Sequence, residues 1–228
     1  MPEWMQCVVA LGRSSWWVSG SSGSQECAAV QRPPYGPVDR WCCIAVNVTT
    51  ADPRLDGRAI KRVAFDAERI AARVRELGEE VTARYPEGDL LVLGLLKGSF
   101  IFLGDLVRQI RRPLQVDFLV AASYGEGTAS SGHVKLVYDP ETTLEGKHIL
   151  LVEDIVDSGR TLNRLIGLLM QRRPRSLDIC ALLHKHVAEH LQYEVALVGF
   201  DAPNEFLVGY GLDHAENFRH LPYIASLQ

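Results

Sequence analysis

Beyond residue 60 the apolar positions of the chain follow two alternating periods, which predict alternating helices and strands. Within residues 65–85 apolar side chains recur every three or four positions, as in an amphipathic helix, and Asp66 stands where it can cap the start. Leu90–Leu96 is a continuous apolar run, typical of a strand buried on both faces. Similar patterns predict helices at 100–110 and 160–172, and strands at 115–122, 134–138, 148–152, 177–183 and 195–200.

This order of elements predicts the fold class. Strands that alternate with helices imply right-handed crossovers, so we expect an α/β fold with a doubly wound, mainly parallel sheet. Ligands of such sheets bind beyond the carboxyl ends of the strands. The segments that follow residues 96, 152 and 183 are therefore the places to search for a site.

The first 50 residues follow neither period. All four tryptophans and four of the five cysteines lie within the first 43 residues, and residues 20–36 are rich in Ser, Gly and Pro. We therefore expect residues 1–52 to form a poorly ordered tail and residues 53–228 to form the domain. A secretory signal is not indicated, because the start carries no cation and the apolar run at 7–11 is short. A transit peptide, or translation from a start upstream of the natural one, stays open.

Composition narrows the class of protein. The chain has 228 residues, of which 47% are apolar and 23% charged, as in a folded domain, and its net charge is −4. This charge argues against a broad basic face for nucleic acid or an anionic membrane, and no apolar run is long enough to cross a bilayer. The cysteine spacing fits neither a disulfide framework nor a zinc site, so we expect a reducing, cytoplasmic setting.

The segment at 149–162 carries the most chemical information. Four apolar residues run directly into Glu153 and Asp154, and Asp157 then opens a Ser-Gly-x-Thr turn that leads into a predicted helix. Backbone N–H groups at a helix start, with the hydroxyls of Ser158 and Thr161, form a cradle for phosphate. Gly159 lets the backbone approach the anion closely.

Carboxylates beside a phosphate cradle need an explanation, because like charges repel. The conflict disappears if they bind sugar hydroxyls or a bridging Mg²⁺. For Asp157 taken alone, an acidic residue that only caps the helix is the simpler interpretation. The complete string instead matches each requirement of a phosphosugar ligand.

With these residues the chain resembles the type I phosphoribosyltransferases, and among them the bacterial hypoxanthine/guanine phosphoribosyltransferases, from about residue 60 to residue 228. Three further segments carry the resemblance: residues 95–99 resemble the short pyrophosphate loop, 122–125 the start of the mobile lid, and 206–213 the base-binding segment, with Arg219 six residues later. The resemblance implies a sheet domain with a small base-binding hood.

The activity implied by the resemblance joins a purine base to 5-phosphoribosyl 1-pyrophosphate, giving a nucleoside monophosphate and pyrophosphate. It implies that Asp157 is the general base and acid at purine N7. It implies that Glu153 and Asp154 bind the ribose hydroxyls and, with Asp213, Mg²⁺. The residues implied to hold the 5′-phosphate are Asp157, Ser158, Gly159, Arg160 and Thr161.

The resemblance also implies which residues bind the pyrophosphate. Lys97 and Arg219 would neutralise its developing charge, with Leu96 and Gly98 completing the loop. The family usually has a cis peptide before this lysine, which here is the Leu96–Lys97 bond. A Walker loop is excluded, because the order G-x-x-x-x-G-K-[ST] is absent.

For the purine, the resemblance implies that Lys185 donates to O6, Phe206 stacks on the base and the Leu207 backbone contacts its edge. It implies that Asp213 reaches a second Mg²⁺ through water. Judged without the resemblance, Lys185 reads equally well as a solvated lysine and Phe206 as a core residue. Ser123 and Tyr124 would begin a lid that runs to residue 132, although a hairpin tip has the same composition.

Other interpretations remain at this stage. Within the class, xanthine or guanine alone is a possible base. A regulator that senses phosphoribosyl pyrophosphate and binds nucleic acid is the alternative from another class, although no basic extension is present. The spacing of His186 and His190 permits a zinc site, but no acid or cysteine cluster completes it. Family resemblance also implies a homo-oligomer, either dimer or tetramer.

Overall fold

The computed structural model describes residues 52–55, 57–124, 133–185 and 191–228. The predicted tail falls outside this part except for Asp52, so the domain boundary stays a prediction. The Asp52 carboxylate accepts hydrogen bonds from the Arg54 side chain and, at 3.4 Å, from the Tyr223 hydroxyl. Asp52 therefore contacts the folded unit.

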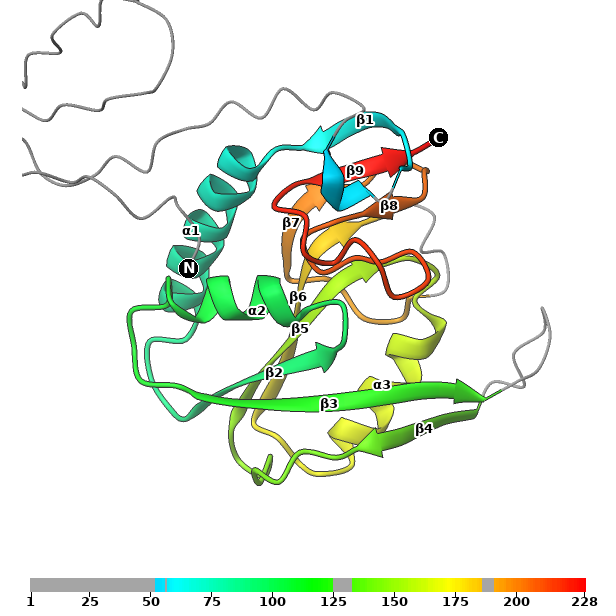
Figure 1. The fold of residues 1–228 in the computed structure, drawn as a ribbon. Helices are drawn as coiled ribbons and strands as arrows, with labels where there is room; N and C mark the ends of the chain where they lie inside the picture. Colours follow the sequence, from blue (N-terminus) through cyan, green and yellow to red (C-terminus); the bar gives the residue numbers. More distant parts are fainter. Residues whose placement is uncertain (1–51, 56, 125–132, 186–190) are drawn as a thin grey trace, which may run out of the picture. The chain divides into compact units, whose positions relative to one another are not determined.

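A six-stranded sheet forms the centre of this unit, in the order β4-β3-β2-β5-β6-β7. All neighbouring strands are parallel except β4, which pairs antiparallel with β3 (Figure 1). The predicted mainly parallel sheet is confirmed. The strands are β2 (Leu90–Leu96), β3 (Gln115–Tyr124), β4 (His133–Tyr138), β5 (His148–Val156), β6 (Ser176–His184) and β7 (Leu197–Asp201).

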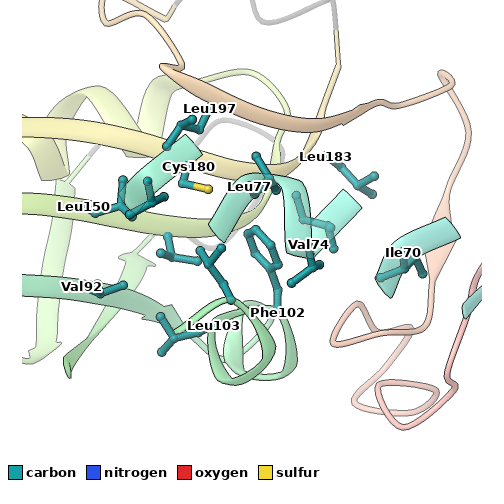
Figure 2. Packing of buried hydrophobic residues seen from close by; sticks show 14 of the residues in the cluster. Ile70, Val74, Leu77, Val92, Phe102, Leu103, Leu150, Cys180, Leu183 and Leu197 are labelled. Carbon is teal, nitrogen blue, oxygen red and sulfur yellow. The ribbon is translucent and has the colours of Figure 1, made fainter. Parts of the chain in front are cut away.

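Three helices cover the two faces of this sheet: α1 (Ala67–Arg84), α2 (Phe100–Val107) and α3 (Arg160–Met170). The Asp66 carboxylate caps α1 by accepting the Arg69 N–H at 2.8 Å, as the sequence predicted. Figure 2 shows α1 and α2 side chains packed with Val92, Leu150 and Cys180 of the sheet.

Alternate residues of the central strands face opposite layers. The neighbours Leu93, Leu151 and Ile179 pack with the apolar side of α3 in a second buried cluster. Because both faces are buried, these strands read as continuous apolar runs, which is why the sequence pattern predicted them.

A second, three-stranded antiparallel sheet joins distant parts of the chain. Its order is β1 (Ile60–Phe65), β9 (Ile224–Leu227) and β8 (Leu207–Val208). The short 3₁₀ helix η1 (Pro53–Leu55) packs on it through the buried Leu55. The periodicity did not predict these strands, but the resemblance implied a small hood in this place.

The topology locates a crevice. From β2 the chain passes through α2 to β3 on one side, and from β5 it passes through α3 to β6 on the other. The carboxyl ends of β2 and β5 are therefore neighbours at the point where the direction of winding reverses, where ligands of such sheets bind. In the described part of the chain, no helix combines the length and hydropathy that a membrane span requires.

Candidate active site

A cavity of about 310 Å³ opens at this crevice. One wall is formed by residues 95–98 at the end of β2, and the other by residues 153–162, from the end of β5 into the first turn of α3. Two of the segments that the sequence singled out therefore line one cavity.

Glu153 and Asp154 lie within β5, which corrects the prediction that the strand ends at residue 152 and a loop carries them. Pairing with β6 continues past that point, with Glu153 opposite Ala181 and Val156 opposite His184. The pairing of β5 with β2 stops at Val152, so the carboxylates extend beyond β2 into the cavity. The sheet itself therefore fixes their backbone.

Burial raises the pKa of both carboxyl groups. The Glu153 Oε2 atom is buried with no hydrogen-bond partner among the described residues. Burial, and to a lesser extent the charge of Asp154, raises the pKa of Glu153 well above its usual range. Burial also raises the pKa of Asp154, although its carboxylate accepts the Ile155 N–H at 2.9 Å. Both groups would be stabilised by a cation or by hydroxyl donors of a ligand.

This donor set fits a cation that is shared with a ligand. Among the described residues, no group of three His, Cys, Asp or Glu side chains is gathered for a metal ion. Asp213 does not join Glu153 and Asp154, because its oxygens are already occupied. Oδ1 forms an ion pair with Arg219 Nη2 at 2.9 Å, and Oδ2 accepts the Glu216 N–H at 2.8 Å. Mg²⁺ commonly binds one or two carboxylates and completes its shell with phosphate and water, which the unpartnered oxygen of Glu153 suits.

We expect Glu153→Gln to stabilise the protein in the absence of ligand and Mg²⁺. A raised pKa in the folded state means that stability is lost as pH rises above the ordinary glutamate value of 4.5. Glutamine does not ionise and escapes this loss. Thermal unfolding should give a higher melting temperature for the variant at pH 7 and a smaller difference near pH 4. Equal curves at both values would contradict the burial argument.

The first turn of α3 is the predicted anion cradle. Gly159 has φ +74°, and a Cβ there would lie 2.7 Å from the Leu191 side chain. The helix begins without a side-chain cap, and Ser158, Gly159 and Thr161 at its start line the cavity, so its first amides have no capping side chain to satisfy them. Such amides, together with the helix dipole, favour a phosphate. Arg160 is the first residue of the helix and is exposed.

Asp157, at the start of the cradle, forms an ion pair with Lys185. The Lys185 Nζ lies 3.5 Å from Asp157 Oδ2, and the Lys185 side chain is only 16% exposed whereas Asp157 is 62% exposed. The Lys185 N–H donates to the Val156 carbonyl at 3.0 Å, which extends the β5–β6 pairing. Lys185 is therefore not a solvated surface lysine.

The turn after β2 packs closely against β5 on one side and against the segment at Gly211 on the other. The Leu96–Lys97 peptide is cis, as expected, and the Ser99 hydroxyl donates to the Leu95 carbonyl at 2.6 Å. A Cβ on Gly98 would lie 1.6 Å from Asp154 Oδ2, and one on Gly211 would lie 2.0 Å from the Gly98 carbonyl oxygen. Glycine is required at both positions for this approach.

The structure brings Lys97 and Arg219 together, with an acid that the sequence analysis missed. Glu216 Oε2 lies 3.1 Å from Lys97 Nζ and 3.4 Å from Arg219 Nη2. Arg219 also donates to the Gly211 carbonyl at 2.8 Å. These cations lower the pKa of Glu216, with Lys97 as the main cause. No local pattern signalled Glu216, because its segment is not helical and its partner Lys97 is distant in the sequence.

The segment that was predicted to bind the base is only partly buried. Phe206 precedes β8 and is 60% exposed, so it is not a core residue, whereas Leu207 is buried at the start of β8. The Phe206 ring contacts that of His214, with centroids 5.4 Å apart.

Two predictions remain open. Ser123 and Tyr124 end β3. Their side chains lie outside the described residues, as do residues 125–132, His186 and His190. The lid and the zinc alternative are therefore untested.

Comparison with known proteins identifies the family. Residues 64–215 match the phosphoribosyl transferase domain, so the chain belongs to this family. The relatives narrow the class. The chain is 42% identical over 168 residues to the hypoxanthine phosphoribosyltransferase of Buchnera aphidicola, covering 73% of this chain and 95% of that one. It is 44% identical to that of Salmonella typhimurium, covering 69% and 90%.

Solved structures agree. A hypoxanthine phosphoribosyltransferase from Staphylococcus aureus superposes with a TM-score of 0.72 at 40% identity, covering 74% of this chain and 92% of that one. A hypoxanthine-guanine phosphoribosyltransferase from Bacillus anthracis gives 0.71 at 39% identity, covering 75% and 100%. Within the family, the chain therefore belongs to the bacterial-type hypoxanthine phosphoribosyltransferases. The alternative of a nucleic-acid-binding regulator is not supported.

Proposed function

We propose that the chain transfers the 5-phosphoribosyl group of 5-phosphoribosyl 1-pyrophosphate to hypoxanthine, guanine or both, in purine salvage. The products are the nucleoside monophosphates IMP or GMP and pyrophosphate. The observation that carries this proposal is the pair of Asp157 and the mostly buried Lys185, 3.5 Å apart beside the anion cradle. The pair offers a base and a donor to one planar ligand.

The phosphoribosyl half of the substrate is bound by the wall formed by β5 and α3. The 5′-phosphate sits in the cradle of residues 157–161, and Glu153 and Asp154 bind the ribose hydroxyls. Glu153 and Asp154 would hold a Mg²⁺ ion together with the substrate, and this ion would supply positive charge to the pyrophosphate. The raised pKa values of Glu153 and Asp154 suit groups whose charge is completed by the ligand.

The purine half lies against the base-binding segment. Phe206 offers an exposed ring for stacking, the Leu207 backbone contacts the edge of the base, and Lys185 donates to O6. Asp157 removes the proton at N7 as the glycosidic bond forms. Asp213 orients Arg219 and would help to hold a second Mg²⁺ from outside its direct ligands.

The leaving pyrophosphate meets two cations. Lys97 and Arg219 stabilise its developing negative charge, and the backbone of Leu96 and Gly98 forms the floor of this subsite. Ser123 and Tyr124 lead into the lid that closes over the reacting atoms.

The proposal is tested by steady-state turnover with phosphoribosyl pyrophosphate and Mg²⁺. Hypoxanthine, guanine, xanthine and adenine are presented separately, and pyrophosphate release is measured. We expect turnover of hypoxanthine or guanine and little turnover of adenine, which lacks the O6 that Lys185 binds. Tight phosphoribosyl pyrophosphate binding without turnover of any base would contradict the proposal.

We also propose a cytoplasmic homo-oligomer, dimer or tetramer, in which residues 53–228 form the catalytic domain.

Deleting residues 1–50 should leave kcat within about two-fold and the melting temperature nearly unchanged. The reason is that the core clusters and the cavity are built from residues 55–225. Turnover and thermal unfolding of the shortened and full chains check this. A large fall in either would assign the tail to the domain.

A further inference from the structure

A histidine holds the exposed ring of Phe206 from the side. Phe206 is 60% exposed, so the core does not fix its ring. The ring of the half-buried His214 contacts it with the two planes 87° apart and the centroids 5.4 Å apart. This perpendicular geometry is attractive because the positive edge of one aromatic ring meets the negative face of the other. His214 therefore restricts the directions in which the Phe206 ring can turn.

An arginine from the segment before β1 holds the histidine. Arg58 Nη1 lies 3.3 Å from His214 Nδ1. A guanidinium carries only donors, so His214 Nδ1 is the acceptor of this hydrogen bond. The same guanidinium lies 5.7 Å from the ring centroid of the buried Phe218.

The backbone around Arg58 is anchored as well. The Arg58 N–H donates to the Leu55 carbonyl at 2.9 Å, and Leu55 is buried in the same cluster as Phe218. Arg58 lies outside the residues that match the family, so that match assigns it no role. A continuous set of contacts runs from this anchored turn through His214 to Phe206.

We infer that His214 and Arg58 are positioning residues for the purine: they set the orientation of the Phe206 ring before the base arrives. The inference rests on the proposed function, which places the base against Phe206. A ring that is already oriented loses less rotational freedom when the base stacks on it. The two residues should therefore control the KM for the base and leave the KM for phosphoribosyl pyrophosphate unchanged.

Steady-state kinetics of the full-length protein test this, with each substrate varied at saturation of the other. We expect His214→Ala to raise the KM for the base about 2–10-fold, the worth of an edge-to-face contact. The KM for phosphoribosyl pyrophosphate and the melting temperature should stay near wild type. His214→Phe keeps a ring at this position and should restore most of the base affinity.

Arg58→Ala tests the second contact. Because Arg58 acts through His214, Arg58→Ala should raise the base KM in the wild-type background and have no further effect in His214→Ala. Little effect is expected in His214→Phe, whose ring has no nitrogen to accept the hydrogen bond from the guanidinium. This comparison carries the test even if His214→Ala fails to fold.

Two control variants make the same kinds of substitution at positions far from the proposed purine site. His148 contacts the Tyr85 ring at the same 5.4 Å separation, but at the amino end of β5. Arg75 is an exposed arginine on α1. His148→Ala and Arg75→Ala should leave both KM values unchanged.

The outcomes separate the inference from the function on which it rests. An active wild type with an unchanged base KM in His214→Ala, or with equal rises in both KM values, would overturn the role of His214. Additive effects of Arg58→Ala and His214→Ala would overturn the link between them. A wild type that turns over no purine would overturn the proposed function itself.

Discussion

Asp157→Asn should lower kcat by about 10²–10⁴-fold, the usual contribution of general acid–base catalysis. Asparagine keeps the size of the side chain and its contact with the cradle but cannot accept the proton from purine N7. The fold should be retained, because Asp157 is 62% exposed and its ion pair with Lys185, at 3.5 Å, is long. Turnover and phosphoribosyl pyrophosphate binding, measured on the same sample, check both parts of this expectation.

A matched control is Asp139→Asn. Asp139 is also more than half exposed and pairs with a basic side chain, Arg172, at 2.7 Å, but it does not line the cavity. It should leave kcat unchanged. Turnover of Asp157→Asn within a few-fold of wild type would remove Asp157 from the role of base.

Gly98→Ala should have the second largest effect, although it adds a single methyl group. Its Cβ would lie 1.6 Å from Asp154 Oδ2, so either the carboxylate or the turn after β2 must move. The change therefore displaces either the Asp154 carboxylate, which we propose to bind the ribose, or the backbone beside Lys97. A displacement of about 1 Å can cost about 10²-fold in rate. We expect at least this loss in kcat/KM for phosphoribosyl pyrophosphate.

Gly104→Ala is the matched control for the methyl group. Gly104 lies in α2, six residues further along, and a Cβ there meets nothing within 4 Å. Alanine is the better helix former by about 1 kcal/mol, so this variant should be slightly more stable and fully active. Similar activity of the two variants would show that the close approach at Gly98 is not needed.

The sequence predicted the central sheet better than its borders. Leu90–Leu96 was predicted with its observed bounds, because a strand buried on both faces appears as an uninterrupted apolar run. The end of β5 was placed too early, since Glu153 and Asp154 break the run although pairing with β6 continues. Helix α2 ends three residues before its predicted end. The short strands β1, β8 and β9 were missed, because their pairing is set by distant partners.

Local chemistry was predictable in the site, and burial was not. The acid pair and the Ser-Gly-x-Thr turn are contiguous, so their part of the cavity could be predicted from the motif. The low exposure of Lys185 and the high exposure of Phe206 depend on how distant segments pack, which no local pattern reports. Glu216 was missed for the same reason, since its partner Lys97 lies in another segment.

The pairing of β1 with β9 affects the order in which the phosphoribosyl side and the purine side of the site fold. Phe65 pairs with Ile224, about 160 residues away, whereas β5, α3 and the cradle are contiguous in the chain. Contacts between distant residues form late in folding, because closing a long loop loses chain entropy. We therefore expect the cradle to form early and the purine side last. Opening of the small sheet would then release the base while the phosphoribosyl side keeps its structure. The amides of the small sheet should therefore exchange with solvent before those of the central strands.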